Sequence, residues 1–364
     1  MKHVALIPLI GGFPLAAEEV LGTSPYRVLS YPQFYANDKL YTDYKGKVWE
    51  DIRSATVPTN ADLCYGTPPC NGLSTASYKI NKTTGETNVW MIKLAKYALG
   101  FIKPKVYVFE NAPGLWGDNG TTVRCELTKV ARENGYAVTF YHTNSLYHGL
   151  PQSRKRTYTI FVKGDHSLIL PTQRDCHESL VDYLKRKPKG IYDDEFVETP
   201  YFKDWDTVKF LKTKYGDDWR ERVLDGYTHR TIYKHILDYG LMDELISYTK
   251  DERLLRLLCH IKKKVAEGKG YWHKYGNCMI YTDCVNAVFS GNFSYMSHPT
   301  EDRILSIAEY AWLMGLPQDM VIDDWQKLGQ NVPVKTSSDI LRYCIKHIEG
   351  KGEYADVAML MQKR

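Results

Sequence analysis

The chain has 364 residues, of which 43% are hydrophobic and 25% are charged, and its formal net charge is +5. This composition is typical of a globular protein with one large or two ordinary domains, and it excludes collagen-like, low-complexity and membrane-spanning chains. The mild positive charge permits a polyanionic partner without establishing one.

The cysteines give no sign of a metal site or of a disulfide framework. Eight are spread through the chain, and none forms a C-x-x-C pair or a Cys/His cluster with the spacing of zinc ligands. In a chain of this length we expect reduced thiols in a cytoplasmic protein, and we predict that no metal is bound.

The N-terminus permits two interpretations. Met1-Lys2-His3 and the apolar run Val4–Ala17 resemble a secretory signal peptide. The alternative is a buried strand over Val4–Ile10, a turn at Gly11-Gly12 and a short helix over Pro14–Leu21. We favour the strand, because the later elements require a first strand–helix unit. A second strand is predicted over Tyr26–Ser30.

A cysteine on a stiff turn follows the next buried strand. The strand is predicted over Ala61–Tyr65 and ends at Gly66-Thr67-Pro68-Pro69, because two prolines fix φ and remove two N–H donors. Cys70 follows at the carboxyl end of this strand, where open α/β sheets place their chemistry. From this segment alone, the thiol could equally be an inert core group. Residues 71–88 are polar and predict a mobile surface loop.

Strands and helices alternate from residue 88 to residue 163. The pattern predicts a helix over Asn88–Phe101, a strand over Lys105–Glu110 and a helix capped by Thr121 or Thr122. Two further strands are predicted over Tyr136–His142 and Thr157–Lys163, separated by a polar, basic turn at residues 148–156. This alternation indicates an α/β domain with a largely parallel sheet.

The character of the chain changes after about residue 165. Residues 166–270 contain few strand patterns and several amphipathic helices, the clearest over Asp251–Glu267 with a basic face at Lys262-Lys263-Lys264. The pattern over residues 271–295 indicates β structure. Ser306 and Glu309 are typical of a capping box at the start of a helix, and a last helix is predicted to end near Ile348. We therefore predict an inserted domain over residues 166–295, with residues 1–165 and 296–364 forming the other domain.

Four motifs, taken in order, resemble those of the DNA (cytosine-5)-methyltransferase family. They are Gly66-Thr-Pro-Pro-Cys-Asn71, Glu110-Asn-Ala112, His148-Gly-Leu-Pro-Gln-Ser-Arg-Lys-Arg156 and Leu328-Gly-Gln-Asn-Val-Pro333. The family has a Pro-Cys, a Glu-Asn-Val, a Gln-x-Arg-x-Arg and a late Gly-Asn-Ser-Val motif in the same order. Each motif is weak alone, but the ordered set is specific. The resemblance implies a doubly wound, mostly parallel sheet of the class I methyltransferase type, and a target-recognition domain over residues 166–295.

The resemblance also implies roles for individual residues. Cys70 matches the nucleophile that adds to C6 of cytosine and so makes C5 nucleophilic, and Glu110 matches the carboxyl group that stabilises the charge at N3. Asn111, Arg154 and Arg156 match residues that hold the flipped base and order the site. The residues expected to contact DNA are Ser74, Lys79, Lys82 and Gln152. The residues expected to contact S-adenosylmethionine are Ile7, Ile10, Gly11, Gly12, Phe13, Asp51, Ile52, Thr67, Pro69, Asn331 and Val332.

The cofactor side departs from the family pattern. In the first motif, Ile7 stands at the position where the family has phenylalanine, and Leu9 stands at the position of the first glycine. The side chain of Leu9 would crowd a backbone that approaches the ligand. No acid directly follows the second strand, although Asp38 lies a few residues further on. Three other positions also differ from the family: Thr67 replaces a glycine, Gln330 an asparagine and Ala308 an arginine.

Three interpretations of the function therefore stay open. The first is a methyltransferase with a divergent S-adenosylmethionine site, the second is a C5-modifying enzyme with a different donor, and the third is a non-catalytic DNA-binding homologue. Retention of Cys70, Glu110 and both arginines disfavours the third. The expected partner is double-stranded DNA, with RNA less favoured. We expect a monomer in the cytoplasm of a bacterium, encoded by the host or by a phage.

Overall fold

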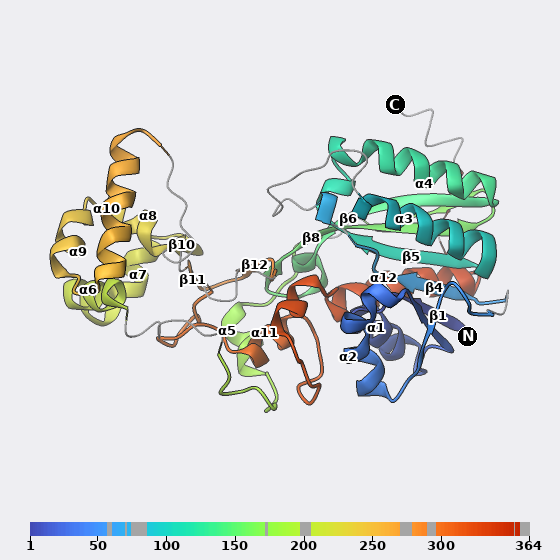
Figure 1. Cartoon of the computed structure of the whole chain (residues 1–364), viewed down its shortest axis with the longest axis horizontal. Coiled ribbons are helices and arrows are strands. Elements are labelled where there is room, and N and C mark those ends of the chain that lie inside the picture. Colours follow the sequence, from blue (N-terminus) through green and yellow to red (C-terminus); the bar gives the residue numbers. More distant parts are fainter. Residues whose placement is uncertain are drawn as a thin grey trace.

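The computed structural model describes residues 1–56, 60–69, 71–73, 86–171, 174–196, 205–269, 279–289, 296–352 and 354–356. A seven-stranded sheet forms the centre of its larger part (Figure 1). The strand order is β3-β2-β1-β4-β5-β8-β6; the first five strands are parallel, and β8 is antiparallel to both β5 and β6. The strands are β1 His3–Leu6, β2 Arg27–Ser30, β3 Trp49–Asp51, β4 Leu63–Gly66, β5 Val106–Asn111, β6 Tyr136–Asn144 and β8 Lys155–Lys163.

Helices cover both faces of this sheet, because its central strands send alternate side chains into two cores. Ala5 and Val108 enter a core shared with α1, α2 and α12, whereas Val4 and Tyr107 enter a core shared with α3 and α4. These helices are α1 Gly12–Leu21, α2 Tyr35–Lys45, α3 Glu86–Tyr97, α4 Thr121–Glu133 and α12 Val334–Ile348. The predicted doubly wound, mostly parallel α/β fold is therefore confirmed.

The strand order reverses between β1 and β4, and this reversal positions the site. The chain leaves β1 toward α1 and leaves β4 toward α3, on opposite faces of the sheet. Ligands of open α/β sheets bind in the crevice that such a reversal opens at the carboxyl ends of the strands. In this chain that edge carries the turns after β1, β4 and β5.

The favoured interpretation of the N-terminus agrees with the structure, because β1 lies between β2 and β4 and is followed by α1. Two other local predictions are corrected. Neither predicted threonine caps α4, whose N-cap is Gly120. The predicted basic turn over residues 148–156 begins at the last residue of a 3₁₀ turn, η6 (Ser145–His148), and includes a short strand, β7 (Gln152–Ser153), and the start of β8.

The other short helices join the main elements. They are η1 Pro32–Phe34, η2 Asn71–Leu73, the π-helical turn η3 Ala98–Ile102, η4 Pro113–Leu115, η5 Asp118–Gly120, η8 Gly216–Asp218 and η9 Trp325–Gln330. Of the polar loop predicted over residues 71–88, positions 74–85 lie outside the described residues.

A group of helices lies apart from the sheet, on the left of Figure 1. It contains α6 Asp206–Tyr215, α7 Trp219–Leu224, α8 Ile232–Asp238, α9 Met242–Tyr248 and α10 Glu252–Ala266, with the strand pair β10 His229–Thr231 and β11 Met279–Tyr281. The predicted helix over Asp251–Glu267 is α10, and the Asp251 carboxylate caps it by accepting from Arg253 N at 2.8 Å. Residues 271–278 and 290–295, predicted as β structure, lie outside the described residues.

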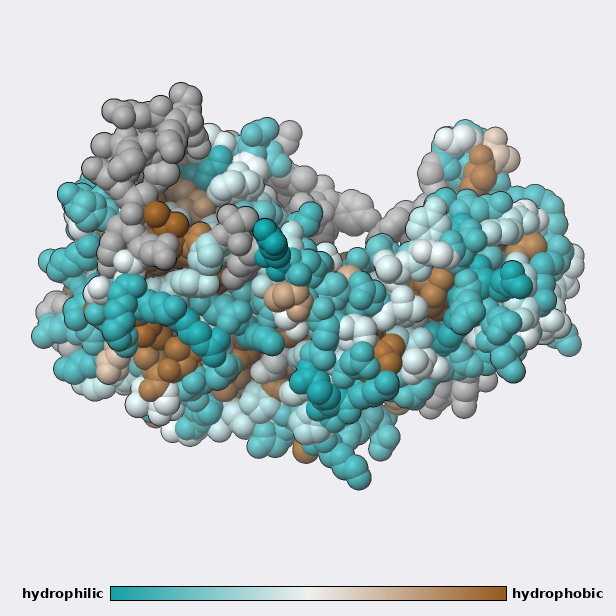
Figure 2. All heavy atoms as spheres, turned by 180° about the vertical axis from the view of Figure 1, so that it is seen from behind, coloured by the Kyte–Doolittle hydropathy of each residue, from teal (hydrophilic) through white to brown (hydrophobic). Residues whose placement is uncertain are grey.

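Two helices lie between the sheet and this helical group (Figure 1). α5 (Leu180–Lys185) contacts α11 (Ile307–Leu313) through Tyr183 and Trp312, each of which donates to the other's carbonyl, at 2.9 and 3.1 Å. The predicted capping box of α11 is confirmed. Figure 2 shows a hollow between the sheet part and the helical group on a mostly hydrophilic surface.

The edge of the sheet part extends past residue 165. β9 (His166–Leu168) pairs with β13 (Tyr354–Asp356), and Thr139 of β6 donates to Leu168 O at 3.2 Å. The chain therefore leaves the sheet part after residue 168. Among the described residues, none of the helices combines the length and the apolar character needed to cross a membrane.

Candidate active site at the carboxyl ends of the strands

The turns after β4 and β5 contact one another through Asn111. This side chain is fully buried; its Nδ2 donates to Pro68 O at 3.4 Å and its Oδ1 accepts from Ala112 N at 3.0 Å. A Cβ on Gly114 would lie 2.3 Å from Leu73 O, so η2 and η4 pack at backbone distance. The Thr67-Pro68-Pro69 turn and the Glu110-Asn111 motif are thus held together. Cys70 itself lies outside the described residues.

Glu110 and Arg156 form a buried ion pair. Glu110 is the penultimate residue of β5 and is 3% exposed; its Oε1 lies 2.7 Å from Arg156 Nε on β8. The register places Glu110 opposite Tyr158. Burial raises the pKa of Tyr158, and the Glu110 charge raises it further. The pair is fixed because β5 and β8 are adjacent antiparallel strands, which brings residues from two distant motifs to one place.

Arg154 is almost fully buried, and its guanidinium binds three backbone carbonyls. It donates to Val288 O at 2.5 Å, to Gly329 O at 3.2 Å and to Asn331 O at 2.7 Å. These carbonyls belong to the segment that returns from the helical group and to the last motif. Arg154 therefore joins the returning segment to the last motif.

The last motif in turn contacts the first. Asn331 Oδ1 accepts from Gly12 N, the first residue of α1, at 2.9 Å. A Cβ on Gly12 would lie 2.0 Å from Val332 O, so only glycine permits this approach. Asn331 Nδ2 is buried and has no hydrogen-bond partner among the described residues. Gln330, one of the departures from the family pattern, accepts from Asn37 Nδ2 at 3.2 Å near the surface.

Two residues other than glycine in the loop between β1 and α1 adopt a backbone conformation that favours glycine. Ile7 has φ 49° and Leu9 has φ 52°, in the left-handed region that side chains rarely adopt. Leu9 N donates to Asp38 Oδ1 at 2.8 Å, and the Ser30 hydroxyl donates to the same carboxyl group. Burial raises the pKa of Asp38 to about 7, although both hydrogen bonds oppose the shift. Asp38 therefore joins the ends of β1 and β2.

Asp51 and Ile52 end β3 beside an aromatic cluster. Hydrogen bonds from Arg53 hold the pKa of Asp51 below its ordinary value, and Ile52 is 5% exposed. Burial raises the pKa of the Tyr31 hydroxyl, and the nearby Asp51 charge raises it further. The Tyr31 ring centroid is 4.8 Å from that of Trp90, and Phe34 lies 5.2 Å from Trp90. The sequence analysis missed this cluster, because its members come from the residue after β2, from η1 and from α3.

The other residues expected at the cofactor are mostly in the core. Ile10, Phe13 and Val332 are buried there, and Phe13 stacks on Tyr65 with centroids 5.8 Å apart. Their side chains support the loop, so any ligand contact at these positions involves the backbone. Gly11 has φ 105°, Thr67 is buried, and Pro69 is half-buried at the end of the Thr67–Pro69 turn.

The residues expected to contact DNA are only partly described. Ser74, Lys79 and Lys82 lie outside the described residues. Gln152 is fully buried; its Nε2 donates to Leu313 O at 3.1 Å, and its Oε1 accepts from Val288 N at 3.1 Å. The structure thus corrects the expectation for Gln152, which holds the returning segment instead of facing DNA.

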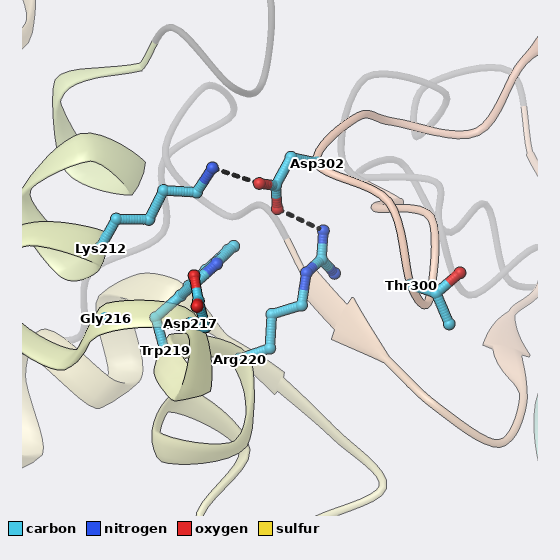
Figure 3. A pocket seen from close by; sticks show the side chains of 7 residues that line it. All are labelled: Lys212, Gly216, Asp217, Trp219, Arg220, Thr300 and Asp302. Atoms are coloured by element: carbon cyan, nitrogen blue, oxygen red, sulfur yellow. Dashed lines mark hydrogen bonds and ion pairs between the residues drawn. The ribbon is translucent and has the colours of Figure 1, made fainter.

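A separate cavity of about 300 Å³ lies where the helical group meets the returning chain (Figure 3). Asp302 lies between Lys212 and Arg220 and pairs with both, at 3.2 Å from Arg220 Nη2. Arg220 also donates to His298 O at 2.9 Å. The two cations are matched by Asp302 and Asp217 in the lining, so these contacts fasten the helical group to the returning segment.

Together the fold and the site define a class I methyltransferase. The sheet has the order and the antiparallel strand of that class, and its carboxyl edge carries the Glu110–Arg156 pair, the Thr67–Pro69 turn and the acid Asp51 at the end of β3. The family model for C-5 cytosine-specific DNA methylases matches residues 1–345. The chain therefore belongs to that family, and the predicted enzyme class, a DNA (cytosine-5)-methyltransferase, is confirmed.

Known proteins agree with this assignment. The type II methyltransferase M1.HphI of Haemophilus parahaemolyticus is 31% identical over 292 residues, 78% of this chain and 68% of that protein. M.AgeI of Thalassovita gelatinovora is 30% identical over 138 residues, 38% of this chain but only 31% of that protein. The structure of a DNA modification methyltransferase encoded within an E. coli prophage superposes with a TM-score of 0.57 at 14% identity, covering 96% and 99% of the two chains. That likeness shows the fold.

Proposed function

We propose that this chain transfers a methyl group from S-adenosylmethionine to C5 of a cytosine in double-stranded DNA, through a covalent adduct between Cys70 and C6. One series of contacts carries the proposal. Asn111 binds the Pro68 turn, the adjacent Glu110 pairs with Arg156, Arg154 binds Asn331 O, and Asn331 binds Gly12. Motifs that are far apart in the sequence thus support one site.

Each residue has a chemical task in this proposal. The Cys70 thiolate adds to C6, and the displaced electron pair is stabilised by a proton that Glu110 shares with N3. Arg156 orients Glu110 and places a positive charge beside the base. After C5 has taken the methyl group, loss of the C5 proton and departure of the thiolate restore the aromatic ring. Because the base lies inside a stacked duplex, it must be flipped out before these steps.

The residues at the ends of β1–β3 fit the adenosyl group of the donor. S-adenosylmethionine supplies a methyl group made electrophilic by the positive sulfur that carries it. The Asp51 carboxylate can accept from an amine of the adenine, and Ile52 and Tyr31 offer apolar surface for its flat ring. The buried Asn331 Nδ2 leaves a donor for a polar group of the ligand. The same site would also suit another donor of this shape.

Labelled S-adenosylmethionine and duplex DNA of mixed sequence test the proposal. We expect label transfer by the wild type, none by Cys70→Ser, and a rate lowered roughly 100-fold or more by Glu110→Gln. Glu133→Gln is the matched control, because Glu133 is exposed at the end of α4. The nucleosides are then identified by mass spectrometry. An absence of both donor binding and transfer would refute the proposal, whereas a C5 adduct other than methyl would establish a different donor.

The partner and the setting follow from the same proposal. The helical group and the segments that join it to the sheet part serve as the target-recognition domain, which starts after Leu168 rather than at residue 166 because β9 belongs to the sheet part, and DNA lies in the hollow seen in Figure 2. The matched relatives include bacterial and prophage proteins, which supports an enzyme acting in the bacterial cytoplasm. We propose that it acts as a monomer. Transfer to RNA but not to DNA in the same assay would contradict the duplex substrate.

A further inference from the structure

The chain passes between the sheet part and the helical group along two segments that lie side by side. On the outgoing segment, Cys176 N donates to Leu146 O at 3.3 Å, and Leu180 N donates to Asp283 O of the returning segment at 2.7 Å. The returning segment then forms β12 (Val285–Asn286), which pairs in parallel with β7. The two segments therefore form one joint, and that joint rests on the strand that leads to Arg154.

A histidine, a carboxylate and a thiol meet in this joint. One ring nitrogen of His177, a carboxylate oxygen of Asp283 and the Sγ of Cys284 all lie within 4.8 Å of one another. His177 Nε2 is buried and lies 3.1 Å from Asp283 Oδ2, yet it makes no hydrogen bond of good geometry. Asp175 Oδ1 lies 2.5 Å from His177 Nδ1 and fixes the ring from its other side.

This set of donors is typical of a zinc site. Nitrogen, sulfur and carboxylate oxygen together favour Zn²⁺ over Mg²⁺ or Ca²⁺, which prefer oxygen alone. With metal–ligand bonds of about 2.0–2.3 Å, tetrahedral donors lie about 3.3–3.8 Å apart, within reach of small side-chain rotations here. A carboxylate on the second ring nitrogen is the usual support of a ligating histidine. A water molecule would complete the four ligands.

We propose that His177, Asp283 and Cys284 bind a Zn²⁺ ion that fastens the joint between the sheet part and the helical group. His177 and Asp283 are separated by 106 positions in the sequence, so the ion closes a loop that contains α6–α10. Val285 directly follows the ligands and pairs with Gln152, and Val288 O accepts from Arg154. The ion therefore stabilises the returning segment against which Gln152 and Arg154 pack, and the attachment of the helical group to the sheet part. Its role does not depend on which donor the enzyme uses.

Cobalt is the most direct probe of the site. The full-length protein is freed of metal with a chelator and titrated with Co²⁺, whose bond to a thiolate gives a near-ultraviolet charge-transfer band. We expect one equivalent to bind with this band, Zn²⁺ to displace it, and Cys284→Ser to abolish it. Asp175→Asn should keep the band but weaken Co²⁺ binding about 10–100-fold, because it removes only the support of His177.

Cys176→Ser is the matched control. Cys176 is a neighbouring exposed cysteine whose Sγ lies 3.3 Å from Tyr147 O, and this variant should keep the full band. A second measurement on the wild type needs no variant: Zn²⁺, but not Mg²⁺, should raise the thermal midpoint of the metal-free protein. The proposal is refuted if the wild type gives no thiolate–cobalt band, if Cys284→Ser keeps it, or if Mg²⁺ stabilises as well as Zn²⁺.

Discussion

Asp38 should make the folded protein less stable as the pH rises. Burial raises the pKa of this carboxyl group from 3.8 to about 7. The folded state therefore keeps a proton that the unfolded state loses between about pH 4 and pH 7, and stability falls as the pH rises through this window. At 1.36 kcal/mol per pH unit, the full effect is about 4 kcal/mol, of which about 3 kcal/mol falls between pH 5 and pH 8.

The substitution Asp38→Asn removes this titration and keeps the shape of the site. Its amide oxygen can still accept from Leu9 N, and its NH₂ group can donate to the Ser30 hydroxyl. We expect the variant to match the wild type only below about pH 4, and to exceed its free energy of unfolding by about 1–2 kcal/mol at pH 5 and about 4 kcal/mol at pH 8. Urea unfolding at unit steps of pH, followed by circular dichroism, measures both quantities.

Asp43→Asn is the control, because it makes the same change at an exposed position of α2 and should follow the wild type. The reasoning fails if Asp38→Asn retains the pH slope of the wild type between pH 5 and pH 8. It also fails if the variant is less stable than the wild type at pH 8, since the charged carboxylate would then be a favourable part of the loop.

Three further variants test the frame of the site. Arg154→Met should lower the free energy of unfolding by about 3 kcal/mol, because three buried carbonyls lose their donor; a loss below 1 kcal/mol in urea unfolding would show that water replaces it. Gly12→Ala should cost about 1–3 kcal/mol, because its Cβ would overlap Val332 O, whereas Gly117→Ala, where the nearest atom is 4.0 Å away, should be tolerated. Arg156→Gln should cost about 3 kcal/mol by leaving the Glu110 carboxylate buried without its cation. Adding Glu110→Gln to Arg156→Gln should recover most of that loss, and a double-mutant cycle showing additive costs would contradict the pairing.

The position of the site at one edge of the sheet could be predicted, because parallel strands place their carboxyl ends at the same edge. The motifs at Gly66–Asn71 and Glu110–Ala112 each end a buried strand that reads as a continuous apolar run, so the ends of β4 and β5 could be placed from the sequence. The contact between Glu110 and Arg156 needed one more fact, the antiparallel pairing of β5 with β8. Hydrophobic periodicity does not reveal the direction of a strand. The chemical roles of Glu110 and Arg156 could therefore be predicted from the motifs, but the contact between them could not.

Contacts that depend on distant segments could not be predicted in this way. The sequence presents Gln152 and Arg154 as polar residues on a basic turn, but both side chains are buried against the returning segment. Gln152 accepts from Val288 N, and Arg154 donates to Val288 O. His177 and Asp283 meet only because β12 pairs with β7. A pattern that is local in sequence contains no information about such a meeting. The missing zinc-ligand spacing therefore argued against a metal site without excluding one.

In the altered first motif, the backbone keeps a conformation typical of glycine although the glycine is replaced. A side chain in the left-handed region costs about 1–2 kcal/mol, yet Leu9 keeps φ 52° at the position where the family has glycine. Asp38 offsets this cost, because its carboxyl group accepts from Leu9 N and is itself held by Ser30. The acid missing after β2 is thus recovered from α2 and used to hold the loop. The divergence lies in the side chains of Ile7 and Leu9, and the backbone at both positions stays in the left-handed region. A frame kept at such a cost favours continued use of a donor at this edge of the sheet over loss of the cofactor.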